Sequence, residues 1–82
     1  MELTNENILK ALAYVIEPDL KKDIVELNLV QDIRVDGNNL SFTVQVNNPA
    51  LHNKKRMVEA CEMNIYRFFD VIGSIHILQL TQ

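Results

Sequence analysis

The single cysteine of the chain, Cys61, is the first residue whose side chain offers chemistry. It lies four residues after Met57 and four before Ile65, on the apolar face of a predicted helix. A free cysteine at such a position behaves as a small hydrophobic residue, whereas a reactive thiol needs exposure and positive neighbours. We therefore expect Cys61 to pack in the core and to be neither a nucleophile nor a metal ligand. A lone cysteine forms no internal disulfide, which fits a reducing compartment.

Three consecutive basic residues, Lys54, Lys55 and Arg56, form the one basic run of the chain. They fall near the start of a predicted helix, where positive charge costs about 0.3–1 kcal/mol each at low salt. Together with Asn53 and the unpaired amides of a helix start, they would suit an anion, either a phosphate or an acidic patch on a partner. The other interpretation is a solvated surface run whose cost is screened by salt. Both interpretations stay open at this point.

Four carboxylates, Glu17, Asp19, Asp23 and Glu26, cluster in a short polar segment. Their spacing matches no defined calcium loop, and the glycine that such a loop needs is missing. We expect them to accept hydrogen bonds from local amides in caps and turns. The two histidines, at positions 52 and 76, have neither an HxxxH nor a CxxC motif beside them. We therefore expect no metal site and no catalytic residues.

The composition bounds the class of protein. The chain has 82 residues, of which 48% are hydrophobic, and a net charge of −3. This suffices for one modest core, so we expect one domain over residues 1–82. An acidic chain lacks the positive footprint of a nucleic-acid binder. Its two glycines exclude the GxxxxGK and GxGxxG phosphate-binding loops. With no apolar run near the roughly 18–20 residues of a membrane span, we expect a cytoplasmic protein without a membrane partner.

The N-terminal half predicts one helix and one hairpin that must position these side chains. Thr4 is a typical N-cap, and apolar residues at helical spacing predict a helix over residues 5–16, ahead of Pro18. From Val30 to Val46, apolar and polar residues alternate on either side of a turn sequence that contains Gly37. This pattern predicts a β-hairpin with one buried face and one solvated face.

The C-terminal half predicts a second helix and a last strand. Asn48-Pro49 indicates the helix start, because asparagine is a preferred cap and proline loses nothing at the first helical position. Residues 75–80 are typical of a strand, with His76 on its solvated face. The order α-β-β-α-β predicts an α/β (α+β) two-layer sandwich: a three-stranded mixed sheet with both helices on one face. Whether the last strand pairs with the first or the second strand stays open.

Three segments together resemble a known family: VIEPDL at 15–20, DIVELNLV at 23–30 and NPA at 48–50. They resemble the small iron–sulfur cluster assembly domain, whose pattern reads V-x-D-P-E-L, D-I-V-x-L-G-L-V and T-T-P-x-C-P. This domain occurs free-standing in SufT-type proteins and as the N-terminal domain of Mrp-type ATP-binding iron–sulfur carriers. The resemblance implies a binding surface made of the motif residues Glu17, Asp19, Glu26, Asn48, Pro49, Leu51 and His52.

The chain departs from that pattern at the reactive cysteine of the family. Leu51 stands at its position, and His52 stands where the following proline is expected. A leucine neither ligates iron nor carries a persulfide, so we expect no cluster to be bound by this chain alone. The resemblance then implies a non-catalytic accessory domain that docks on an Mrp-type ATPase domain or on iron–sulfur client proteins. The alternative is a small-molecule-binding or dimerisation α/β module with no metal role, and a homodimer is compatible with both.

Overall fold

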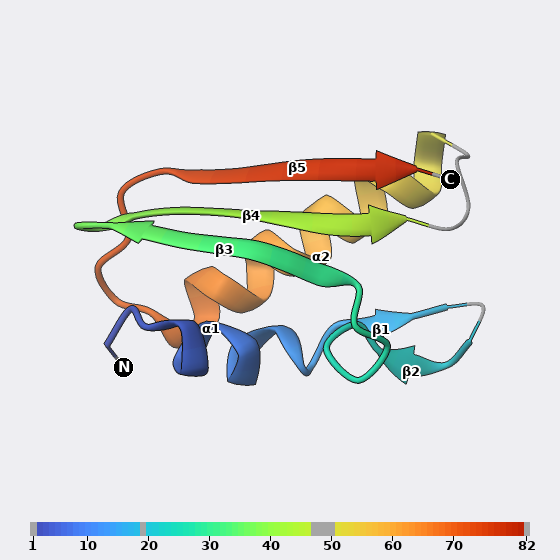
Figure 1. Ribbon diagram of the computed structural model, residues 1–82, viewed down its shortest axis with the longest axis horizontal. Helices are drawn as coiled ribbons and strands as arrows, with labels where there is room; N and C mark the ends of the chain where they lie inside the picture. Colours follow the sequence, from blue (N-terminus) through green and yellow to red (C-terminus); the bar gives the residue numbers. More distant parts are fainter. Residues whose placement is uncertain (1, 19, 47–50, 82) are drawn as a thin grey trace.

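The computed structural model describes residues 2–18, 20–46 and 51–81. The chain runs through two helices and five strands (Figure 1), which are α1 (Asn5–Leu12), β1 (Ile16–Glu17), β2 (Lys22–Asp23), β3 (Val30–Asp36), β4 (Asn39–Val46), α2 (Leu51–Phe68) and β5 (Ile75–Thr81). The predicted order α-β-β-α-β is confirmed for α1, β3, β4, α2 and β5. The short β1–β2 ribbon between α1 and β3 is an addition that the sequence pattern did not indicate.

The main sheet has the strand order β3-β4-β5. Strand β4 runs antiparallel to β3 and parallel to β5, with Leu40 opposite Ile75 and Val46 opposite Thr81. The sheet is therefore mixed, and the last strand pairs with the second strand of the hairpin. Both helices lie on one face of this sheet, α1 against β3 and α2 against β5, as the two-layer sandwich requires (Figure 1).

The β3–β4 hairpin has the turn that its sequence predicts, and a bulge that it does not. Gly37 adopts a positive φ of 61° in the two-residue connection between the strands. Asp32 also has a positive φ, 53°, at the place where the register shifts between Gln31 and Arg34. An extra residue in one strand increases the local twist and interrupts the ladder. The β3 edge of the sheet is therefore irregular.

The core follows the alternation of β4. Leu40, Phe42, Val44 and Val46 are all buried on the helix-covered face. Thr43 was expected on the solvated face, but it is only 6% exposed, because its register neighbours in β3 and β5 flank it. The fully formed core also includes apolar residues from both helices and from the loops, namely Ile8, Ala11, Leu12, Val15, Ile24, Leu29, Met57, Cys61, Ile65 and Phe69.

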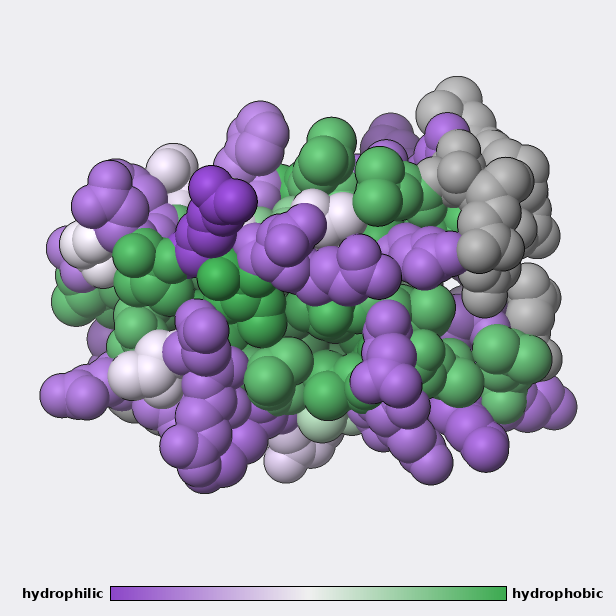
Figure 2. Space-filling model, in the orientation of Figure 1, coloured by the Kyte–Doolittle hydropathy of each residue, from purple (hydrophilic) through white to green (hydrophobic). Residues whose placement is uncertain are grey.

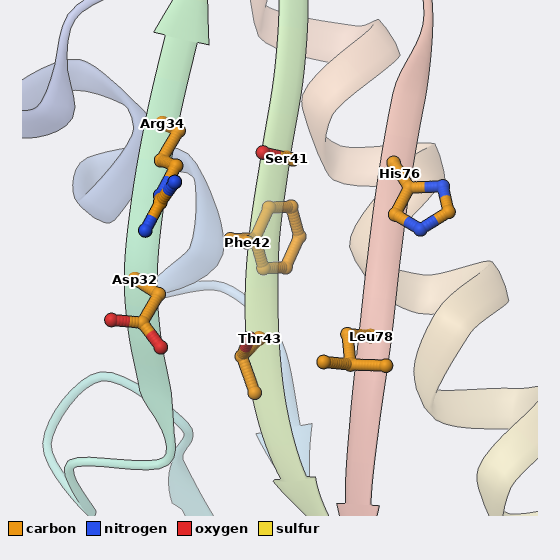
Figure 3. Close-up of a pocket in the computed structure, with 7 residues that line it drawn as sticks. All are labelled: Asp32, Arg34, Ser41, Phe42, Thr43, His76 and Leu78. Atoms are coloured by element: carbon orange, nitrogen blue, oxygen red, sulfur yellow. The ribbon is translucent and has the colours of Figure 1, made fainter.

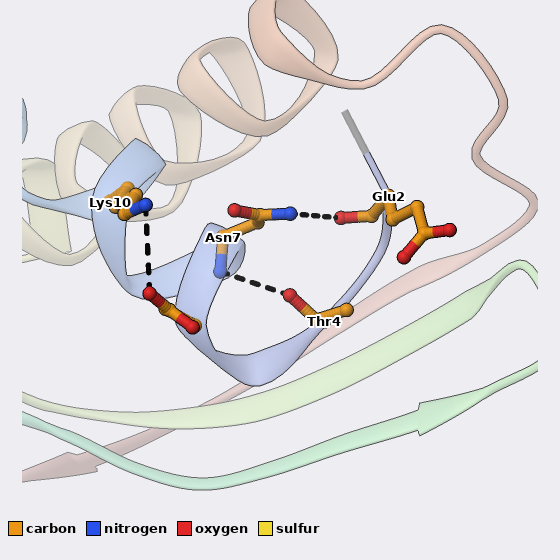
Figure 4. A network of polar contacts seen from close by, with 5 residues as sticks. Glu2, Thr4, Asn7 and Lys10 are labelled. Carbon is orange, nitrogen blue, oxygen red and sulfur yellow. Dashed lines mark hydrogen bonds and ion pairs between the residues drawn. The ribbon is translucent and has the colours of Figure 1, made fainter.

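The start of α1 agrees with prediction, but its end does not (Figure 4). Thr4 caps the helix, since its Oγ1 accepts the Asn7 N–H at 3.2 Å, and the Asn7 side chain donates to the carbonyl of Glu2 at 2.9 Å. The helix ends at Leu12 and not at residue 16. Val15 and Ile16, which fit the helical spacing, instead turn away to start the ribbon.

Gly73 allows the chain to pass from α2 into β5 close to the hairpin turn. Its N–H donates to the carbonyl of Asn38 at 2.6 Å, and a Cβ at this position would lie 2.5 Å from Oδ1 of Asn39. That same Oδ1 accepts hydrogen bonds from both the N–H and the hydroxyl of Ser74 at 3.0 Å. The start of β5 is thus fixed beside the start of β4.

Candidate functional site

The β1–β2 ribbon and the turn after it hold Glu17 and Glu26, the two predicted motif residues whose side chains the structure describes. Its two strands are antiparallel, with Ile16 opposite Asp23 and Glu17 opposite Lys22. Ile24, directly after the ribbon, donates its N–H to the carbonyl of Val15 at 3.0 Å, and its side chain is fully buried. Strands β1 and β2 are thereby anchored to the core and lie beyond the C-terminal end of α1 (Figure 1).

Two carboxylates of this segment, Glu17 and Asp23, accept hydrogen bonds from backbone amides in turns, as predicted. Glu17 is 6% exposed, and its Oε2 accepts the Leu20 N–H at 2.7 Å. Its carbonyl accepts the Lys21 N–H at 2.8 Å, and Lys21 takes a left-handed φ of 57°, a conformation that costs a non-glycine residue energy. Asp23 Oδ1 accepts the Glu26 N–H at 2.8 Å, while the Glu26 side chain is exposed. The acidic segment therefore stabilises its own backbone.

A surface hollow of about 190 Å³ lies between the ribbon and α2. The ribbon side contributes Ile16 and Pro18, and α2 contributes Arg56 at the rim. The remaining lining is Val15, Met57 and Ala60. Of the residues predicted for a site, Arg56 lines this hollow, opposite Pro18 of the acidic segment, whereas Glu17 and Glu26 are not among its lining residues. The sequence reasoning missed the apolar lining, because it placed Ile16 on a helix and read Met57 only as a core residue.

The other predicted surface residues divide into three groups. Leu51, His52 and Asn53 form the first turn of α2, and their side chains lie outside the described part of the chain. Asp19, Asn48 and Pro49 lie outside the described residues altogether, as does the predicted cap of α2. In the basic run, Lys54 is partly buried, whereas Lys55 and Arg56 are exposed. Of this run, Arg56 is the residue that reaches the hollow.

Cys61 packs in the core, as expected. Its side chain is 0% exposed, and burial, with a smaller contribution from the charge of Glu62, raises the pKa of its thiol from 9.0 to about 12. Iron–sulfur clusters are held by thiolates, and a buried protonated thiol does not fit that role. In the described ranges no group of three or more His, Cys, Asp or Glu side chains is placed to hold a metal ion.

The helix-free face of the sheet carries a second, wider hollow of about 300 Å³ (Figure 3). Arg34 and Asp32 stand on β3, and His76 stands on β5, with small side chains of β4 between them. His76 is exposed there, which confirms its predicted place on the solvated face. No helix of the described ranges has both the length and the apolar character needed to cross a lipid bilayer.

The fold is that of a small helix-covered mixed sheet already seen in a solved structure. A domain of unknown function, DUF59, from Bacillus anthracis superposes with a TM-score of 0.82 over 92% of this chain and 72% of that chain, at 24% sequence identity. This likeness defines the fold class. Residues 5–67 match the model of the family described as iron–sulfur cluster assembly protein. The chain belongs to this iron–sulfur cluster assembly family.

A longer relative carries the same type of domain. The iron–sulfur cluster carrier protein of Synechocystis sp. (strain ATCC 27184 / PCC 6803 / Kazusa) is 38% identical to this chain over 60 residues. The match covers 73% of this chain but 17% of the carrier protein. This chain therefore spans a small part of that carrier protein, most of which has no counterpart in these 82 residues.

Proposed function

We propose that this chain is a non-catalytic accessory domain of iron–sulfur cluster assembly or transfer. It docks on the ATP-binding part of an Mrp-type carrier or on a client protein that receives the cluster. Two findings support this proposal: the family match over residues 5–67, and the 38% identity to a cluster carrier protein. A lone cysteine that is buried and protonated fits the reducing cytoplasm in which we place the protein.

The hollow between the ribbon and α2 is the observation that carries the docking proposal. Its lining is mostly apolar and includes Ile16, which is 54% exposed, and Leu20 of the same segment is 53% exposed. Exposed apolar side chains next to a concave site with a charged rim are typical of protein–protein contacts. Arg56 at that rim favours a partner segment that places a carboxylate opposite an apolar side chain.

Leu51 explains why docking, and not cluster binding, is the proposed task. It opens α2 at the position where the family pattern has its cysteine, and it has no donor atom for iron. The one thiol of the chain is in the core. The domain therefore supplies a shaped surface, while the cysteines that hold the cluster come from the partner.

Binding measurements with variants on and off the hollow test the proposal. We expect the 82-residue chain to bind the ATP-binding domain of an Mrp-type carrier, or an iron–sulfur client, in biolayer interferometry. Arg56→Glu and Ile16→Asp should each weaken binding about 10-fold, because each places a charge against the expected partner surface. Arg67→Glu and Val71→Asp are matched controls on exposed positions outside the hollow. Equal effects of test and control variants, or no binding to either partner class, would overturn the proposal.

A further inference from the structure

The two edges of the main sheet differ in how they are protected against pairing with another chain. The β3 edge has the bulge at Asp32 and, in addition, the charged residues Arg34 and Asp36. Charges and bulges are the usual devices that keep an edge strand from pairing. Strand β5 forms the opposite edge (Figure 1) and pairs with β4 alone within residues 2–18, 20–46 and 51–81.

The β5 edge has none of these devices. Its 7 residues, Ile75–Thr81, include no Asp, Glu, Lys, Arg, Pro or Gly. The register with β4 is continuous over the whole strand, so the strand is regular. Leu78 and Leu80 are 53% and 47% exposed, and apolar side chains stand among polar ones over β5 on the face shown in Figure 2. A regular, uncharged edge with exposed leucines is a template for another strand.

Helix α2 lies on the other face of the sheet and presents a stripe of alternating character. Lys54, Val58 and Glu62 follow one another at intervals of four residues, and all are partly buried. The opposite flank of α2 faces the ribbon and α1, through Arg56 and through Phe68, whose ring stacks on Tyr14 at 5.2 Å. The stripe therefore lies on the β5 side of the helix.

A hydrogen bond fixes the position of Lys54 along the direction of β5. The side chain of Gln79 donates to the carbonyl of Lys54 at 2.7 Å. Because α2 connects two parallel strands, it runs antiparallel to β5. Glu62 lies two turns further along, about 12 Å away at 1.5 Å per residue. At about 3.3 Å per strand residue, Glu62 lies near the level of Ile75, so the middle of the stripe lies beside Ile77 and Leu78, at the centre of β5.

We propose that two copies of this chain pair through their β5 strands, running antiparallel around a two-fold axis beside Leu78. The two three-stranded sheets then continue into one another. The rotation places the two Leu78 side chains together, and it sets Lys54 of each copy opposite Glu62 of the other, with the Val58 side chains between them. The stripe of cation, apolar residue and anion is complementary to itself only under such a two-fold rotation.

The arrangement of charges on α2 favours a second copy of this chain as the partner of the β5 edge. A chain with a net charge of −3 repels its own copy at most surfaces, but β5 carries no charge, and the α2 stripe pairs opposite charges across the axis. The interface lies on the flank of α2 opposite to Arg56. The dimer proposal can therefore be tested separately from the docking proposal.

Charge exchange on α2 provides the main test, read by sedimentation equilibrium of the 82-residue chain over a range of concentrations. We expect a monomer–dimer equilibrium for the unaltered chain. Lys54→Glu and Glu62→Lys should each weaken the dimer about 10-fold, because each sets like charges opposite one another twice. An equimolar mixture of the two variants should restore dimers, as should the double exchange in one chain. Arg67→Glu and Glu59→Lys are the matched controls and should leave the equilibrium unchanged.

Two variants on β5 test the strand pairing itself. Leu78→Lys should weaken the dimer about 100-fold, since it brings two ammonium groups together at the axis, whereas Val71→Lys should not. Leu78→Cys should give a disulfide-linked dimer under mild oxidation, while the buried Cys61 does not react. A monomer at every concentration, an absence of rescue in the mixture, or an absence of cross-linking would overturn the proposal.

Discussion

The two flanks of α2 face very different structures. On one side, Arg56 and Ala60 meet the irregular β1–β2 ribbon, which includes a left-handed residue and a buried carboxylate. On the other side, the carbonyl of Lys54 accepts a hydrogen bond from Gln79 of the regular strand β5. An irregular segment can form a hollow of individual shape, which suits a partner that differs from the domain itself. A regular strand edge offers a repeating pattern that a copy of the same strand can match. Under the two proposals, one small domain binds two kinds of partner at once.

The largest expected effect comes from the core that both flanks share. Ile65 is 0% exposed and lies on the face of α2 between the two flanks. Ile65→Ala should lower the free energy of unfolding by about 3 kcal/mol, from lost burial and the cavity that remains. Both proposed interfaces should weaken together, because both depend on the position of α2. Chemical denaturation measures the first effect, and the binding and sedimentation assays measure the second.

Met63→Ala is the matched control for this prediction. Met63 is on the same helix but is 69% exposed, so its truncation should change stability by less than about 0.5 kcal/mol. If Ile65→Ala disturbed one interface and spared the other, the idea that α2 supports both flanks as a rigid element would be wrong.

Glu17→Ala should weaken docking at the hollow and leave dimerisation through β5 unchanged. The substitution removes a buried carboxylate that accepts the Leu20 N–H at 2.7 Å, which should lower the free energy of unfolding by about 2 kcal/mol. Docking at the hollow should weaken as the turn loosens. Dimerisation through β5 should stay within about 2-fold of the unaltered chain once measured below the melting temperature, because distant sites act independently.

Glu26→Ala provides the comparison, since the Glu26 side chain is exposed in the same segment. It should change the free energy of unfolding by less than about 0.5 kcal/mol. Equal losses of stability in the two variants would mean that the hydrogen bond of Glu17 does not hold the turn.

The sequence predicts the regular helices and strands of this fold well, because their apolar residues recur at fixed intervals. The alternation from Leu40 to Val46 predicts both the hairpin and the buried face of β4, and Thr4 correctly predicts the start of α1. The end of α1 is wrong because Val15 and Ile16 keep the helical spacing although they belong to other structure. Apolar residues at intervals of three or four show which positions are buried. The same intervals also occur where a chain leaves a helix and turns back over the core.

The candidate site is harder to predict than the fold, because it is made from segments without a period. The resemblance points to the segment around Glu17, whereas the hollow depends on Met57 and Ala60, whose types are ordinary for a core helix. The pairing of β5 with β4 depends on the path of the chain after Gly73, which no local pattern records. The Pro18 turn between two short apolar segments is the one signal that could have indicated the ribbon.

The smallest expected effect concerns the pH dependence of the core between the flanks. Burial, and to a lesser degree the charge of Glu62, raises the pKa of Cys61 from 9.0 to about 12. Above pH 9 the unfolded chain loses this proton and the folded chain keeps it, so the folded state binds more protons and its stability falls as pH rises towards 12. Between pH 7 and pH 10 the unaltered chain should lose about 1 kcal/mol more than Cys61→Ala, because the other titrating groups are common to both. Parallel urea titrations of the two chains, at concentrations below dimer formation, measure this difference. Equal losses of stability in the two chains would mean that the thiol ionises in the folded state. A thiolate in the core would make Cys61 a candidate ligand again, between the hollow and β5.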